Sequence, residues 1–66
     1  MYYVEVKHKG EVVATTYQDL LSDSVQQADK LSFRDCNVTI YECVKSLIDY
    51  VIIATVLSWK DDGERN

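Results

Sequence analysis

Residues 50–59, YVIIATVLSW, restrict the fold of this chain more than any other stretch. None of them is charged, and most are β-branched or aromatic side chains, which lose rotamer freedom in a helix but suit a strand. The stretch is also shorter than the roughly 18–20 apolar residues that cross a bilayer. The residue types therefore predict a strand over 50–59. A helix is the alternative, because apolar residues also recur here at helical spacing. These residues are Val44, Leu47, Ile48, Val51, Ile52, Val56 and Trp59.

The first 17 residues have the pattern of a β-hairpin. Residues before Gly10 alternate between apolar and polar, and those after it are rich in Val and Thr. Glycine supplies the positive φ that a tight hairpin turn requires. A two-residue turn would set Val6 opposite Val13 and gather apolar side chains on one face. A three-residue loop would pair Val6 with Val12 instead, and both registers stay open.

Residues 19–33 have the spacing of a helix. One apolar stripe is formed by Leu21, Val25, Ala28 and Leu31. Ser24 and Thr16 are each followed three residues later by Gln or Asp, which fits a capping box. We therefore predict a helix from about Asp19 to Phe33, followed by a turn to which Asn37 contributes.

Residues 38–44 alternate again and predict a strand that pairs with 50–59. The expected fold is α+β, a ββαββ arrangement in which a four-stranded antiparallel sheet has one helix packed on one face. A chain of 66 residues forms one small domain, which we place at residues 1–60, with a flexible polar tail at 61–66.

A strand over 50–59 would carry apolar side chains on both of its faces, whereas one helix can cover only one face of the sheet. The expected core combines Val51, Ile53 and Leu57 with Val38, Ile40 and the helical stripe. The residues left on the uncovered face are Tyr41, Cys43, Tyr50, Ile52 and Val56, with Tyr17. We predict that these six residues form an interface with a partner protein or a second copy. The alternative is that the sheet curls, and that the tail and residues 47–48 partly cover this face.

No motif for catalysis, a metal or a cofactor is present. Cys36 and Cys43 with one distant His8 do not have zinc-ligand spacing, so we expect two reduced, half-buried thiols. His8 lies beside the hairpin turn and is expected to be a solvated loop residue. The carboxylate pair Asp61 and Asp62 falls in the predicted tail, where nothing would tune its pKa. We therefore expect no enzyme, no metal and no cofactor.

The net charge is −4, with seven Lys and Arg spread among eleven Asp and Glu. Nucleic-acid binding needs a basic face, so no direct nucleic-acid partner is expected. The N-terminus does not have a basic region followed by an apolar run, so we expect no signal peptide, no membrane partner and a cytoplasmic location.

These observations favour a small non-enzymatic protein-binding module that inhibits or regulates another protein. Many stand-alone chains of this size come from bacteriophages or mobile elements and act on a host enzyme or defence system. A similar origin for this chain is suggested only by how common such proteins are, and by none of its residues. One alternative is a self-assembling structural homo-oligomer, a homodimer or larger, with no external target. A second alternative is an acidic nucleic-acid mimic.

Overall fold

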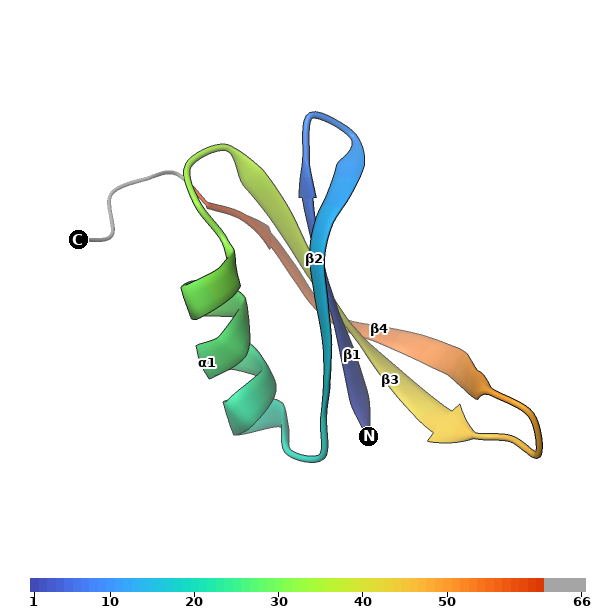
Figure 1. Cartoon of the computed structure of the whole chain (residues 1–66). Coiled ribbons are helices and arrows are strands. Elements are labelled where there is room, and N and C mark those ends of the chain that lie inside the picture. The colour runs from blue at the N-terminus through green and yellow to red at the C-terminus, as the bar shows by residue number, and fades with distance from the viewer. Residues whose placement is uncertain (62–66) are drawn as a thin grey trace.

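The computed structural model describes residues 1–61 and contains four strands and one helix within them. The elements in chain order are β1 (Tyr2–His8), β2 (Glu11–Gln18), α1 (Leu21–Leu31), β3 (Cys36–Lys45) and β4 (Tyr50–Lys60). All neighbouring strands are antiparallel, and the sheet order is β2-β1-β3-β4 (Figure 1). The predicted ββαββ fold is therefore confirmed. The predicted strand over 50–59 is also confirmed, and these residues do not form the alternative helix.

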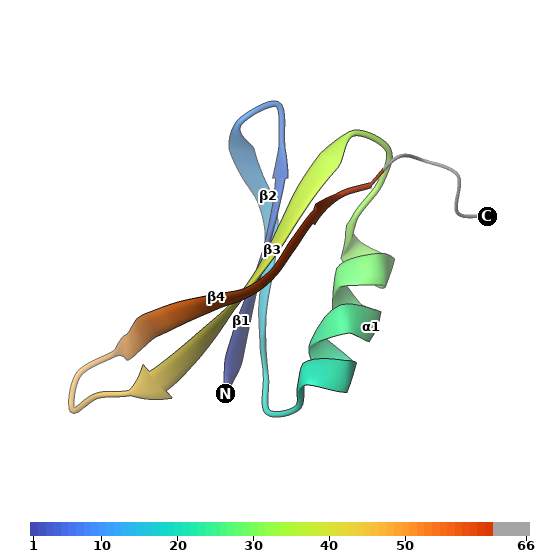
Figure 2. The same cartoon turned by 180° about the vertical axis from the view of Figure 1, so that it is seen from behind.

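The helix covers only part of the sheet. α1 packs on one face, mainly against β1 and β2 and to a lesser extent against β3 (Figure 1). The far end of the β3–β4 hairpin projects away from the helix, which is also visible from behind (Figure 2). The molecule is therefore elongated, with extents of 40 × 24 × 15 Å. Within residues 1–61, no helix is long and apolar enough to cross a membrane.

The core lies between α1 and the covered part of the sheet. Its fully buried members are Val4, Val6, Ala28, Cys36, Val38 and Ile40. The helical stripe was predicted correctly, since Leu21, Val25 and Leu31 pack against this cluster around Ala28. The assignment of Val51, Ile53 and Leu57 to the core was wrong, because all three are exposed. In β4 it is Trp59 that packs against the core.

The turn between β1 and β2 has the predicted two-residue form. His8 pairs with Glu11, so only Lys9 and Gly10 lie between the paired residues. Both have positive φ, 53° for Lys9 and 83° for Gly10. Two such residues in succession match the hairpin turns whose twist suits antiparallel strands, and glycine adopts this conformation without steric cost.

A β-bulge between Val6 and Lys7 changes the register of the same hairpin. Beyond the bulge Val6 pairs with Ala14, so both registers predicted for Val6 were wrong. The extra residue moves every later residue of β2 by one position relative to β1. Tyr17 consequently lies directly opposite Tyr3.

The ends of α1 differ from the prediction. Leu20 is the N-cap and has no side-chain cap bond, so neither predicted capping box forms. Ser24 lies within α1, not at its N-cap, and is buried. Its Oγ donates a hydrogen bond to the Leu20 carbonyl oxygen at 3.0 Å. After the helix, Asp35 turns the chain with a φ of 67°, and Asn37 is already part of β3.

Asp61 joins the end of β4 to the C-terminal end of α1. Its side chain accepts a hydrogen bond from Ser32 Oγ at 3.0 Å, and its backbone N–H donates to the Cys36 carbonyl oxygen at 2.8 Å. The backbone N–H of Asp35 donates to the Asp61 carbonyl oxygen at 3.0 Å. Asp61, expected in a flexible tail, is instead only 6% exposed. The remainder of that predicted tail, 62–66, lies outside the described residues.

Candidate protein-interaction surfaces

Four tyrosine rings lie together on one face of the sheet. Tyr3 of β1 pairs with Tyr17 of β2 on one side and with Tyr41 of β3 on the other. The ring centroid of Tyr3 lies 5.0 Å from that of Tyr17 and 5.9 Å from that of Tyr41. Tyr50 of β4 has its ring centroid 4.7 Å from that of Tyr17. These four residues, called the tyrosine cluster below, bring together side chains from all four strands.

The alternation of β1 places the tyrosine cluster on the face opposite α1. Val4 and Val6 are buried in the core beside the helix, so Tyr3 and Glu5 point to the other side of the sheet. The three other tyrosines of the cluster were predicted for this uncovered face. Tyr3 was omitted from the predicted interface, although its alternation with Val4 and Val6 is a clear signal for the same face.

Ile52 and Cys43 lie on the face of the tyrosine cluster but differ in exposure. They pair with each other across β3 and β4, and Ile52 is exposed. Cys43 is only 1% exposed, so its expected place on an accessible surface was wrong. The rings of Tyr17 and Tyr50 come from the two outer strands and meet, so they must extend over the inner strands β1 and β3. The Cys43 thiol itself donates to the Met1 carbonyl oxygen at 3.5 Å.

Val56 is the sixth residue of the predicted interface, and it lies at a bulge. Ile40 pairs with Leu57 and the next residue, Tyr41, pairs with Thr55, so Val56 has no direct partner in β3. It is exposed, and β4 is an outer strand of the sheet. Val56 therefore lies along the open edge of β4.

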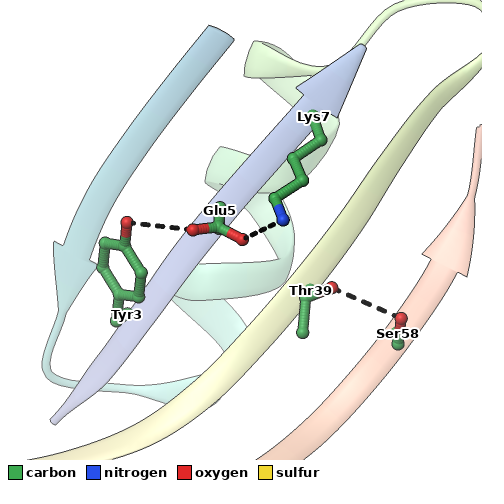
Figure 3. Close-up of polar contacts among 5 residues, drawn as sticks. All are labelled: Tyr3, Glu5, Lys7, Thr39 and Ser58. Atoms are coloured by element: carbon green, nitrogen blue, oxygen red, sulfur yellow. Dashed lines mark hydrogen bonds and ion pairs between the residues drawn. The ribbon is translucent and has the colours of Figure 1, made fainter. Parts of the chain in front are cut away.

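Polar side chains lie next to the tyrosine cluster on this face (Figure 3). Tyr3 Oη donates a hydrogen bond to Glu5 Oε2 at 3.4 Å, and Lys7 Nζ lies 3.6 Å from Glu5 Oε1. Thr39 Oγ1 and Ser58 Oγ of the neighbouring strands lie 3.4 Å apart. The uncovered face thus combines the tyrosine cluster with polar side chains, and the exposed Val12 lies beside Lys7 at its far end.

The phenol of Tyr3 is held in its neutral form. Burial of the side chain raises its pKa above the usual value, and the nearby Glu5 carboxylate raises it further. A neutral phenol remains a hydrogen-bond donor and adds no charge to the tyrosine cluster.

The second exposed surface is the projecting end of the β3–β4 hairpin. β1 begins at Tyr2, which lies opposite Glu42, and the Met1 carbonyl oxygen still accepts the Cys43 N–H at 2.9 Å. Beyond Cys43, β3 and β4 continue without a neighbouring strand on the β3 side (Figure 1). Large aliphatic side chains are exposed here. We call them the hairpin patch: Val44, Leu47, Ile48, Val51 and Ile53.

The turn at the end of the hairpin presents two of these side chains fully to solvent. The Ser46 backbone N–H donates to the Asp49 carbonyl oxygen at 2.6 Å, and the Asp49 N–H donates to Ser46 Oγ at 3.0 Å. Asp49 Oδ1 accepts from the Tyr50 N–H at 2.7 Å. The polar groups of the turn therefore bond to one another, while Leu47 and Ile48 are fully exposed. These two residues do not cover the neighbouring apolar surface, contrary to the alternative considered for a curled sheet.

His8 and the two cysteines occupy positions unlike those predicted. His8 is the last residue of β1, with its ring centroid 4.9 Å from that of Phe33 and its Nδ1 buried without a partner in the described structure. Its cross-strand neighbour is Cys36, whereas Cys43 lies at the other end of β3. Both thiols are free and fully buried, not half-buried. Among residues 1–61, no three His, Cys, Asp or Glu side chains are grouped so as to hold a metal ion.

Comparisons with known proteins give no relative for this chain. No family model, no curated protein and no solved structure matches it.

Proposed function

We propose that this chain is a small non-enzymatic module that binds another protein through the tyrosine cluster and thereby inhibits or regulates it. One observation carries the proposal. Side chains from all four strands converge to form a group of aromatic rings on the face that α1 leaves uncovered.

Tyrosine is suited to this role for physical reasons. Its ring offers a large contact area, its hydroxyl can bond to polar groups of a partner, and it loses little conformational entropy because only two side-chain torsions are fixed. Tyrosines are accordingly enriched among the residues that dominate binding energies. The rings of the cluster also contact one another, which reduces the entropy lost on binding.

The polar part of the same face matches the usual surroundings of such a centre. Protein interfaces commonly have an apolar or aromatic centre and a polar rim that stays hydrated. Glu5, Lys7, Thr39 and Ser58 supply polar groups next to the tyrosine cluster (Figure 3). This mixed composition is typical of an interface that forms between proteins that are each stable alone.

The test compares two variants of strand β2. Tyr17 is 46% exposed and Val13 is 47% exposed, so Tyr17→Ala and Val13→Ala truncate equally accessible side chains on one strand. The wild-type chain and both variants are immobilised and used to capture proteins from a lysate of cells that contain the chain. We expect a protein that wild type and Val13→Ala retain and Tyr17→Ala loses.

The recovered protein is then titrated calorimetrically with each form of the chain. Loss of an aromatic residue at the centre of an interface costs about 2 kcal/mol or more, so Tyr17→Ala should weaken binding by roughly 30-fold. Val13→Ala should leave the dissociation constant within about twofold of wild type. Equal binding by all three forms would contradict the proposal.

A further inference from the structure

The hairpin patch differs from the tyrosine cluster in the chemistry of its side chains and in the strands that surround it. It consists of aliphatic side chains, on a part of the hairpin that has no neighbouring strand on the β3 side. Val44 pairs with Val51, and the alternation of β3 places Val44 on the same side of the strand as the buried Val38 and Ile40. The patch thus continues the core face of the sheet beyond the end of α1.

We propose that a second copy of this chain covers the hairpin patch, forming a two-fold dimer in which the two projecting hairpins pack patch against patch. The proposal does not depend on the function suggested for the tyrosine cluster, because the two surfaces use different residues. A two-fold contact needs a surface that is complementary to itself, and a patch of aliphatic side chains can pack against its own copy.

The stability of the hairpin is the first argument for a second copy. A two-stranded hairpin alone is marginally stable in water, and it needs a further strand or a packed face for independent stability. Beyond Cys43, whose backbone N–H donates to the Met1 carbonyl oxygen at 2.9 Å, the hairpin has no further strand on its β3 side, and its helix-side residues Val44 and Val51 are exposed. A regulatory target is not always present, whereas a second copy is present wherever the chain accumulates. Small domains with limited cores often gain stability from association in this way.

The area available is the second argument. A standard stable interface buries about 800 Å² from each partner. Two side chains of the hairpin patch are fully exposed and three are about half exposed, so these five residues can supply a substantial part of that area. Interfaces between identical subunits are also more apolar than those of transient complexes, which matches this aliphatic composition.

The distribution of charge is the third argument. Two copies of a chain with a net charge of −4 repel each other unless their contact avoids acidic side chains. Residues 50–59 contain no charge at all. Glu42 lies beside Tyr2 at the inner end of the hairpin patch, and Asp49 lies in the turn between Ile48 and Val51. Within residues 44–53 the charged residues are Lys45 and Asp49, whose charges cancel, so this part of the hairpin adds no net charge to a contact between two copies.

Sedimentation equilibrium of the full chain over a micromolar concentration range tests the proposal. We expect a mass of twice 7.6 kDa for the wild type. Val51→Asp should weaken dimerisation by more than about 100-fold, because the two-fold axis places the new charge in the interface twice. Val13→Asp is the matched control, since Val13 and Val51 are each 47% exposed, and it should remain dimeric. Circular dichroism of each variant checks that the sheet is retained.

A second variant covers the case in which Val51→Asp does not fold. Leu47 and Ile48 lie in the turn and are fully exposed, so replacing both with Ser removes nothing from the core of the monomer. This double variant should also weaken the dimer by at least tenfold.

Two results would overturn the inference, a monomeric wild type and a dimer held by the tyrosine cluster, and they distinguish it from the proposed function. A wild-type chain that is monomeric throughout the range excludes the dimer but leaves binding through Tyr17 intact. If that monomer binds another protein and Val51→Asp abolishes the binding, the occupant of the patch is that protein. A dimer that Tyr17→Ala dissociates and Val51→Asp does not would place the self-contact at the tyrosine cluster, and both proposals would fail.

Discussion

The covered end of the sheet and the projecting β3–β4 hairpin are built from similar side chains but differ in burial. Val38 and Ile40 are fully buried beside α1, whereas Val51 and Ile53, further along the same hairpin, are exposed. The difference follows from the geometry of the elements. α1 and β4 each contain 11 residues. An 11-residue helix is about 16 Å long, whereas an 11-residue strand spans about 36 Å.

This comparison teaches that the length and position of α1, and not residue type, limit the core: Leu57 pairs with the buried Ile40 but lies on β4, outside the strands that α1 mainly contacts, and is exposed. A helix of this length covers less than half of the hairpin, and the apolar side chains beyond its end have no cover within residues 1–61. The exposed hairpin is therefore a direct consequence of joining a short helix to two long strands. Such a surface is either a liability for aggregation or a site of association.

The largest effect expected from this comparison concerns Ile40 and Ile53. Ile40→Ala removes a fully buried side chain and should lower the free energy of unfolding by about 2–5 kcal/mol. Ile53→Ala changes an exposed side chain and should lower it by no more than about 1 kcal/mol. Urea unfolding at a concentration where the chain is monomeric measures both values. Equal losses for the two variants would mean that the hairpin is packed within a single chain.

Much of this fold could be predicted from local sequence patterns. Gly10 signals the two-residue turn, the spacing of the helical stripe signals α1, and β-branched residues over 50–59 signal β4. The bulge after Val6 could not be predicted, because it depends on how β2 fits the twist of β1. The end of the core could not be predicted either, since it depends on where α1 lies along the strands.

The candidate site was partly predictable for the same reasons. Alternation along each strand identifies Tyr41 and Tyr50 as residues of the uncovered face, and it also applies to the omitted Tyr3. The burial of Cys43 has no local signal. The neighbour of its thiol and backbone N–H is the carbonyl oxygen of Met1, which is 42 residues away in the sequence.

A smaller effect is expected from the tyrosine cluster at alkaline pH. The pKa of Tyr3 is raised in the folded chain, mainly by burial and then by the Glu5 carboxylate. The folded state therefore holds this proton more tightly than the unfolded state. The resulting stability is fully present below the unfolded pKa, which is about 10, and is lost as the pH rises through the folded value.

Tyr3→Phe removes this titrating group and should flatten the decline of stability above about pH 10. The effect is the smallest of those expected, because solvent screens charges on an accessible face. Urea unfolding of wild type and variant at several alkaline pH values measures it. Identical declines for the two proteins would show that Tyr3 does not contribute.

Amide hydrogen exchange, measured by NMR at increasing protein concentration, tests the central claim most directly. It compares the covered end of the sheet with the projecting hairpin in one unmodified protein. At low concentration, amides of residues 44–51 should exchange much faster than those of Val38 and Ile40. As the concentration rises, protection should increase for residues 44–51 and stay constant at the covered end. Hairpin amides that are as protected as those of Val38 and Ile40 at the lowest concentration would contradict the claim that this region depends on a partner.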